Sequence, residues 1–152
     1  MEVTVERLRL TPDAVRASLA GLPEPGDYAL RVIPLRYREK PHLSAWTEFE
    51  TRSITIQIPQ PFLPFGEVVP YGARRRQGKG MSFIWLTEGI TFRSTDEVLR
   101  FLYLHEWMHW FLKEELGRKS RAETTCDRFA LHNNAKLQVT FDDARAALRR
   151  SV

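Results

Sequence analysis

The stretch His105-Glu106-Trp107-Met108-His109 carries the residue types best able to do chemistry in this chain. Because residues four apart lie on one face of an α-helix, both imidazoles can point at a single metal ion. Imidazole suits zinc, and a water in an open coordination position becomes nucleophilic near neutral pH. Glu106 is turned about a hundred degrees away, where it can contact that water without binding the metal. The motif predicts one zinc ion held by His105 and His109, with Glu106 as the catalytic base.

Chance is the alternative origin for this motif. With four histidines in this composition, one accidental H-E-x-x-H is expected about once in a hundred such chains. The motif lies among apolar residues of a helical segment, where two histidines without a metal would need other hydrogen-bond partners. The pattern therefore favours a metal site, and a pair of satisfied core histidines stays open as the alternative.

A third protein ligand is expected on the next helical segment, in Glu123-Thr124-Thr125-Cys126-Asp127. Glu123 and Asp127 are four apart and so share one helix face. If that face packs against the two histidines, Glu123 can bind the zinc while Asp127 accepts a hydrogen bond from a ligand histidine and fixes its tautomer. The alternative for Glu123 is a first-turn glutamate that completes a capping box with Ser120. Cys126 lies on another side of this helix and is expected to be a small buried residue.

Together the two motifs resemble those of the gluzincin metallopeptidases, in which H-E-x-x-H on one helix is completed by a glutamate in E-x-x-x-D on a following helix. The Asp-x-Phe-Ala pattern of residues 127–130 is also similar to that of the small intracellular zincins of the ImmA/IrrE type. The resemblance covers residues 94–131, about a quarter of the chain. Two other groups are disfavoured: Glu115 stands where a metzincin has a third histidine, and SprT-like DNA-repair proteases would have a histidine near Glu123.

This resemblance implies a zincin-like fold of the α+β class. A small, mainly antiparallel sheet is expected to pack on a long active-site helix, which a glutamate-bearing helix follows. An edge strand would hold extended substrate by pairing with its backbone, and residues 81–92 are the candidate for that strand. Trp107 and Trp110, on either side of the second histidine, either shape the pocket or fill the core.

The implied activity is hydrolysis of peptide bonds by a zinc-dependent metallopeptidase, an endopeptidase in preference to an exopeptidase. Glu106 would take a proton from a zinc-bound water and return it to the leaving amine. Such enzymes usually place a tyrosine or histidine over the cleft to stabilise the oxyanion, and the candidates are His132, Tyr71 and Tyr103. Two alternatives stay open: a zinc-bound, zincin-like binding or regulatory module without proteolytic activity, which recognises a protein or nucleic-acid partner, and an interaction domain without a metal.

Capping residues indicate the helices that must position these groups. Ser94 and Glu97 form a capping box, which begins a helix that Gly117 ends. Ser120 is expected to cap the glutamate-bearing helix, which runs to about residue 131. Residues 141–150 predict a terminal helix, which either packs plainly on the fold or covers the cleft.

Residues 1–92 are expected to form a helix and the sheet. Thr11 caps a short helix that starts at Pro12. Residues rich in β-formers predict strands over 28–37, 45–50 and 53–58. Four prolines predict a long loop over residues 59–80, namely Pro59, Pro61, Pro64 and Pro70. Strand-like composition returns over 81–92, with a hairpin around Glu88-Gly89.

A length of 152 residues suits one domain, with the helix and sheet over 1–92, the active-site helices over 94–133 and the terminal helix over 141–150. No stretch is apolar enough to cross a bilayer, and the alternation of charged and apolar residues over 1–10 argues against a secretory signal. A single cysteine excludes an internal disulfide. The expected location is therefore cytoplasmic.

The net charge of +4 permits an acidic partner without demanding one. The local basic cluster of Arg74, Arg75, Arg76 and Lys79 lies among glycines and predicts a mobile basic loop. A solvated loop is the preferred interpretation, and contact with nucleic acid or an acidic substrate is the alternative with weaker support.

Overall fold

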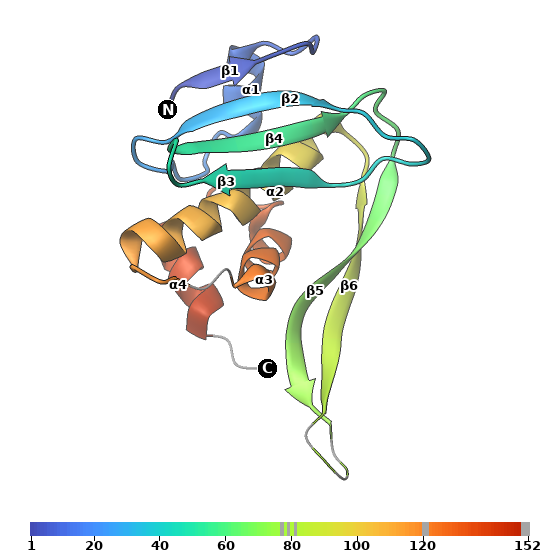
Figure 1. Ribbon diagram of the computed structural model, residues 1–152, viewed down its shortest axis with the longest axis vertical. Helices are drawn as coiled ribbons and strands as arrows, with labels where there is room; N and C mark the ends of the chain where they lie inside the picture. Colours follow the sequence, from blue (N-terminus) through green and yellow to red (C-terminus); the bar gives the residue numbers. More distant parts are fainter. Residues whose placement is uncertain (77, 79, 81, 120–121, 150–152) are drawn as a thin grey trace.

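The computed structural model describes residues 1–76, 78, 80, 82–119 and 122–149. Its main sheet has four strands in the order β1 (Val3–Val5), β2 (Ala29–Leu35), β4 (Ser53–Pro59) and β3 (Ser44–Glu48). Three of these strands match the predicted runs, whereas β1 was not expected. The fold is of the predicted α+β class (Figure 1).

The expectation of a mainly antiparallel sheet is wrong for the main sheet. β1 and β4 both pair with β2 in parallel, and only β3 and β4 pair antiparallel. The reason is strand order: the chain forms β3 at the edge of the sheet and then turns back, so that β4 enters between β3 and β2. Alternation of apolar and polar residues predicts strands with a buried face, but it carries no information about which strand lies next to which.

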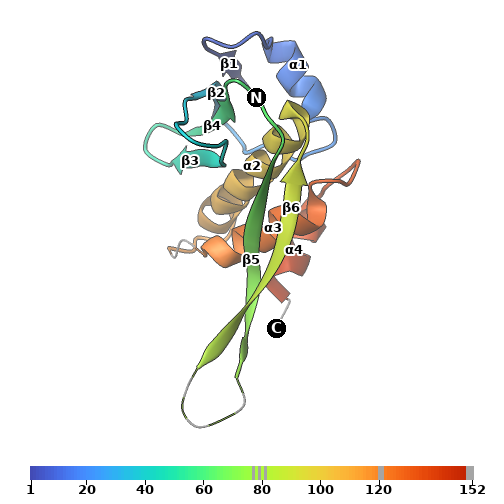
Figure 2. The same cartoon turned by 90° about the vertical axis from the view of Figure 1, so that its right-hand side faces the viewer.

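The two central strands of the main sheet, β2 and β4, bury one of their faces completely. Leu30 and Val32 pair with Ile54 and Ile56 in the ladder, and all four side chains have no solvent exposure. Helices α1 (Pro12–Ser18) and α2 (Thr95–Trp110) lie on the same side of the sheet, as Figures 1 and 2 show together. The Thr11 hydroxyl accepts a hydrogen bond from the backbone N–H of Ala14 at 3.0 Å, which confirms the predicted start of the first helix.

The predicted active-site helix is present, with a wider last turn. The Ser94 hydroxyl accepts from the backbone N–H of Glu97 at 3.3 Å, while the Glu97 carboxylate accepts from the N–H of Arg93 at 2.6 Å. After Trp110 the chain continues as a π-helical segment, η1 (Phe111–Glu115), and Gly117 ends it with a φ of 65°. Turns of this kind often stand beside functional sites.

Helices α3 (Glu123–Asn133) and α4 (Phe141–Arg149) complete the body of the molecule. The residue that precedes α3 is Ala122, with a φ of 46° and no side-chain cap, so the helix begins later than the predicted Ser120 cap. Ser120 lies outside the described residues, as does residue 150 at the predicted end of the terminal helix. Within the described ranges, no helix has the length and apolar character needed to span a bilayer.

Trp107 and Trp110 fill the core and do not shape the pocket. Trp107 has no solvent exposure and stacks on the rings of Phe111 and Phe129 at centroid distances of 5.3 and 5.6 Å. The ring of Phe141 on α4 meets Trp107 edge-on at 5.5 Å. The terminal helix therefore packs on the core. Packing on the fold was the first of the two roles expected for this helix.

Strands β5 (Phe65–Arg75) and β6 (Phe83–Phe92) form a long two-stranded antiparallel ribbon. The predicted loop over 59–80 is therefore correct over residues 60–64 and wrong over residues 65–75, which form β5. The predicted hairpin at Glu88-Gly89 is wrong, because these two residues pair with Val69 and Val68 within the ladder. Pro70 is tolerated for two reasons. Each strand of an isolated ribbon has an unpaired edge, and the register shifts between Pro70 and Gly72.

The ribbon projects beyond the helical body (Figures 1 and 2). The guanidinium of Arg128 on α3 donates to the carbonyl of Tyr71, past the middle of β5, at 2.8 Å. Arg74 and Arg75 belong to β5 and Arg76 follows it, so these described members of the predicted basic loop stand at the far end of a ribbon; Lys79 lies outside the described residues.

Candidate metal centre

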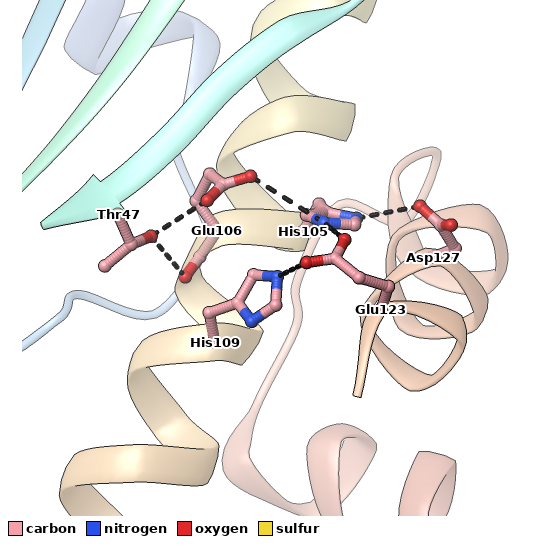
Figure 3. Close-up of polar contacts among 6 residues, drawn as sticks. All are labelled: Thr47, His105, Glu106, His109, Glu123 and Asp127. Atoms are coloured by element: carbon pink, nitrogen blue, oxygen red, sulfur yellow. Dashed lines mark hydrogen bonds and ion pairs between the residues drawn. The ribbon is translucent and has the colours of Figure 1, made fainter. Parts of the chain in front are cut away.

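Helix α2 presents His105 and His109 one turn apart, and Glu123 at the start of α3 faces both (Figure 3). One carboxylate oxygen of Glu123 lies 3.0 Å from Nε2 of His105, and the other lies 2.9 Å from Nε2 of His109. One ligand atom from each of the three residues lies within 4.8 Å of the others, so the group could hold a metal ion. The tertiary packing thus brings together the three residues that the two motifs singled out.

Asp127 contacts the nitrogen of the His105 ring that faces away from Glu123. Its Oδ1 atom is 2.8 Å from Nδ1 of the His105 ring, and it comes from the helix face that also carries Glu123 (Figure 3). A hydrogen bond from Nδ1–H to Asp127 fixes the tautomer in which the Nε2 lone pair is available to a cation. The contact predicted for Asp127 is therefore present in the structure.

Glu106 is buried at the edge of the same group, beside strand β3. Thr47 pairs with Ile54, a residue of the buried sheet face, and its side chain accordingly points at α2. The Thr47 hydroxyl lies 2.9 Å from Oε1 of Glu106 and 3.2 Å from the Glu106 carbonyl oxygen. The second carboxylate oxygen, Oε2, lies 3.7 Å from Nε2 of His105. A role for Thr47 was not predicted, although a strand over residues 45–50 was.

The electrostatics of the group favour a positive charge between the imidazoles and the carboxylates. Burial opposes a charged His105, but hydrogen bonds to Asp127 and Glu123 outweigh it and raise its pKa to about 10. Burial and the neighbouring His105 lower the pKa of His109. The hydrogen bond from His105 lowers the pKa of Glu123, so this ligand is a carboxylate at neutral pH. Carboxylates that stabilise a proton here would also stabilise a cation.

Glu106 has the opposite shift from Glu123. Burial is the main cause, and it raises the pKa of Glu106 even though His105 and the Thr47 hydroxyl lower it. A carboxylate whose pKa is raised toward neutrality is a better proton acceptor than an exposed one. Glu123, by contrast, has a side chain 60 % exposed, which leaves one side of the group open to solvent.

Two cavities follow strand β3 past this group. The first, of about 410 Å³, is lined by residues 45–47 and 49 together with His105, Glu106, His109 and Glu123. The second, of about 330 Å³, is lined by residues 43–45, 101, 102, 105, 106 and 127. β3 is also the terminal strand of the main sheet, with its second edge unpaired. The expected substrate strand over 81–92 lies outside the main sheet: β6 belongs to the separate ribbon, whereas residues of the edge strand β3 line both cavities.

The three candidate oxyanion stabilisers lie away from the group. Tyr103 is buried, and its hydroxyl donates to the carbonyl of Pro23 at 2.7 Å. Tyr71 and His132 contact each other at a ring-centroid distance of 6.1 Å, and neither lines the two cavities. His132 lies nine residues after Glu123 on α3, which places it roughly 13 Å further along the helix axis.

The donor set fits zinc. Two imidazole nitrogens and one carboxylate oxygen, with an open fourth side, form the ligand pattern of a catalytic zinc site. Cys126, the softer ligand nearby in sequence, is fully buried as predicted, and burial raises the pKa of its thiol. No residue of the described part of α4 lines either cavity, so the alternative in which the terminal helix covers the cleft has no support there.

Comparison of the chain with protein-family models, curated proteins and solved structures finds no match in any of the three. The residues of the group and their geometry are therefore the basis on which a function is inferred.

Proposed function

We propose that this protein is a zinc-dependent metallopeptidase that cleaves internal peptide bonds. The observation that carries the proposal is the convergence of His105, His109 and Glu123, whose ligand atoms lie within 4.8 Å of one another. Its two flanking contacts support it, because Asp127 orients His105 and Thr47 orients Glu106. A core histidine pair would need neither an open cavity nor a buried glutamate beside it.

His105, His109 and Glu123 would hold the zinc ion, which when bound polarises a carbonyl and acidifies water. Glu106 accepts the proton of the attacking water and then donates it to the nitrogen of the leaving amine. Thr47 binds one oxygen of Glu106, so the other oxygen is left to move the proton. The raised pKa of Glu106 suits both halves of this exchange, because the group must take the proton and release it.

Substrate is proposed to bind along β3. An extended peptide can add to the unpaired edge of this strand through backbone hydrogen bonds, with its scissile bond beside Glu106. Backbone pairing does not need a free chain terminus. This mode of binding therefore favours an endopeptidase.

The test combines zinc content with cleavage. Elemental analysis of wild type and of Glu106→Gln is expected to find one zinc per chain, while Glu123→Ala is expected to lose most of it. Only wild type is expected to cleave an unfolded protein and a peptide blocked at both ends. Glu115→Ala is the matched control, because Glu115 is an exposed glutamate of η1 that does not line the cavities.

Each outcome distinguishes between the proposed function and an alternative function of the site. Absence of zinc from wild type purified without chelator would overturn the proposal. Zinc in wild type without cleavage of either substrate would favour the binding or regulatory module over the peptidase. Cleavage of free peptides but not of blocked ones would replace the endopeptidase with an exopeptidase.

A further inference from the structure

The far end of the ribbon carries a second group of residues that the metal centre does not use. We define the ribbon end by six of its described residues, namely Arg74, Arg75, Arg76, Phe83, Ile84 and Trp85. The three apolar side chains are 62 %, 38 % and 61 % exposed, and all three arginines are exposed as well. None of the six lines the cavities at the metal centre.

The register of the ribbon places charge and aromatic rings side by side. Arg75 pairs with Phe83, and Trp85 stands two residues along on the same face. Arg74 pairs with Ile84 on the opposite face, so each face has a guanidinium level with an apolar side chain. Acidic residues of the ribbon stand nearer the body, since Glu88 pairs with Val69 and Glu67 with Ile90. The ribbon end is therefore positively charged.

Exposed apolar groups of this size cost free energy unless they meet a partner. The same chain buries Trp107 and Trp110 almost completely, so it has the capacity to cover its large rings. Phe83 and Trp85 instead stay largely exposed on strand β6 of the projecting ribbon (Figure 2). Their position suits a contact with another molecule.

We infer that the ribbon end binds single-stranded nucleic acid. Arginine guanidinium groups bind phosphates, and aromatic rings stack on bases with little regard to sequence. Here both groups occur at the same level of one narrow element, so phosphates and bases of one strand can be contacted together. In a duplex the faces of the bases are covered by their neighbours, and two exposed rings would gain little there.

The arrangement is less suited to a membrane surface. A segment that inserts into a bilayer needs its apolar side chains to lie deeper than its charges. In this ribbon Arg74 and Arg75 are level with their apolar partners, and Arg76 directly follows the end of β5. Insertion of Phe83 and Trp85 would carry these guanidinium groups into the bilayer with them.

This inference goes beyond the proposed peptidase activity and does not depend on it. The test measures fluorescence anisotropy of a labelled single-stranded oligothymidine of about 20 nucleotides, longer than the site of one small binding module. Wild type is expected to bind, and Trp85→Ala is expected to weaken binding at least about fivefold by loss of one stacked base. Trp85→Phe keeps an aromatic ring, so binding is expected to persist while quenching of tryptophan fluorescence is lost.

Charge is tested by salt dependence. Replacement of Arg74, Arg75 and Arg76 by alanine is expected to lower the slope of log affinity against log salt by about 0.7 for each phosphate contact removed. The matched control replaces three exposed arginines of the body, namely Arg9, Arg16 and Arg38. This control removes the same charge and is expected to change the affinity less than twofold.

Several results would overturn the inference. These are no binding by wild type at low salt, equal loss in the control triple variant, or equally tight binding of a duplex of the same length. A different result would assign the surface to membranes. In that case wild type would sediment with anionic phospholipid vesicles, the ribbon variants would not, and wild type would not bind the oligonucleotide. Glu106→Gln is expected to bind the oligonucleotide as wild type does, so failure of the peptidase proposal and failure of this one are distinguishable.

Discussion

Trp107 and Trp85 show how differently the body and the ribbon of this molecule are built. Trp107 lies on α2 with no solvent exposure, stacked between rings from η1 and α3, whereas Trp85 is 61 % exposed on β6. The body is stabilised by burial of its apolar side chains, and it holds the candidate metal centre rigidly. The ribbon end buries little, so its residues contribute mainly to what the molecule can contact.

The largest expected effect is in the core of the body. Trp107→Ala is expected to lower the free energy of unfolding by about 3 to 5 kcal/mol, because it removes a fully buried ring and leaves a cavity. Urea denaturation measures this change. Leu104→Ala, also fully buried, is the milder variant with an expected loss of about 2 to 5 kcal/mol. A loss below 1 kcal/mol in both would break the contrast with the ribbon.

Metal binding is expected to stabilise the body. At zinc concentrations about 100-fold above the dissociation constant, the gain in the free energy of unfolding is about 2.7 kcal/mol. Thermal unfolding with zinc and after chelation measures it. His109→Ala is expected to abolish the difference, and Arg75→Ala on the ribbon to retain it. A gain that survives in His109→Ala would place the metal elsewhere.

Asp127→Asn is expected to weaken zinc binding by about 10- to 100-fold, because the amide can no longer hold the tautomer of His105 through a charged acceptor. Competition with a zinc chelator measures the affinity. Asp142→Asn, an exposed aspartate in the first turn of α4, provides the control. Equal losses in the two variants would point to a general effect of charge.

Thr47→Val is expected to reduce kcat about tenfold while zinc content stays at the wild-type level. The substitution keeps the shape of the side chain and removes the hydroxyl that binds Glu106. Steady-state cleavage of a blocked peptide, with zinc measured on the same sample, separates the two effects. A change in KM alone would assign Thr47 to substrate binding in place of positioning Glu106.

The smallest expected effect belongs to the ribbon end. Trp85→Ala is expected to change the free energy of unfolding by no more than about 0.5 kcal/mol, because the side chain is largely exposed already. The urea denaturation used for Trp107→Ala measures it. A loss of several kcal/mol would mean that Trp85 supports the fold, and the comparison between the two tryptophans would fail.

Several features of the site follow from local periodicity and were predictable. Helical spacing places His105 and His109 on one face, and it does the same for Glu123 and Asp127. Capping residues marked the starts of α1 and α2 in sequence. Strand β5 was missed because Pro70 would break a central strand, whereas a strand with an unpaired edge and a bulge accepts it.

The sequence by itself determined the helices, their helical faces and the donor types of the candidate metal centre, because these depend on residues within a few positions of one another. Only the tertiary structure decided that β3 is the edge strand at the site, that Thr47 contacts Glu106, and that Tyr103 points to Pro23. These outcomes depend on which distant segments pack together. Strand order and the direction of packing are set by the whole core, so no local pattern encodes them.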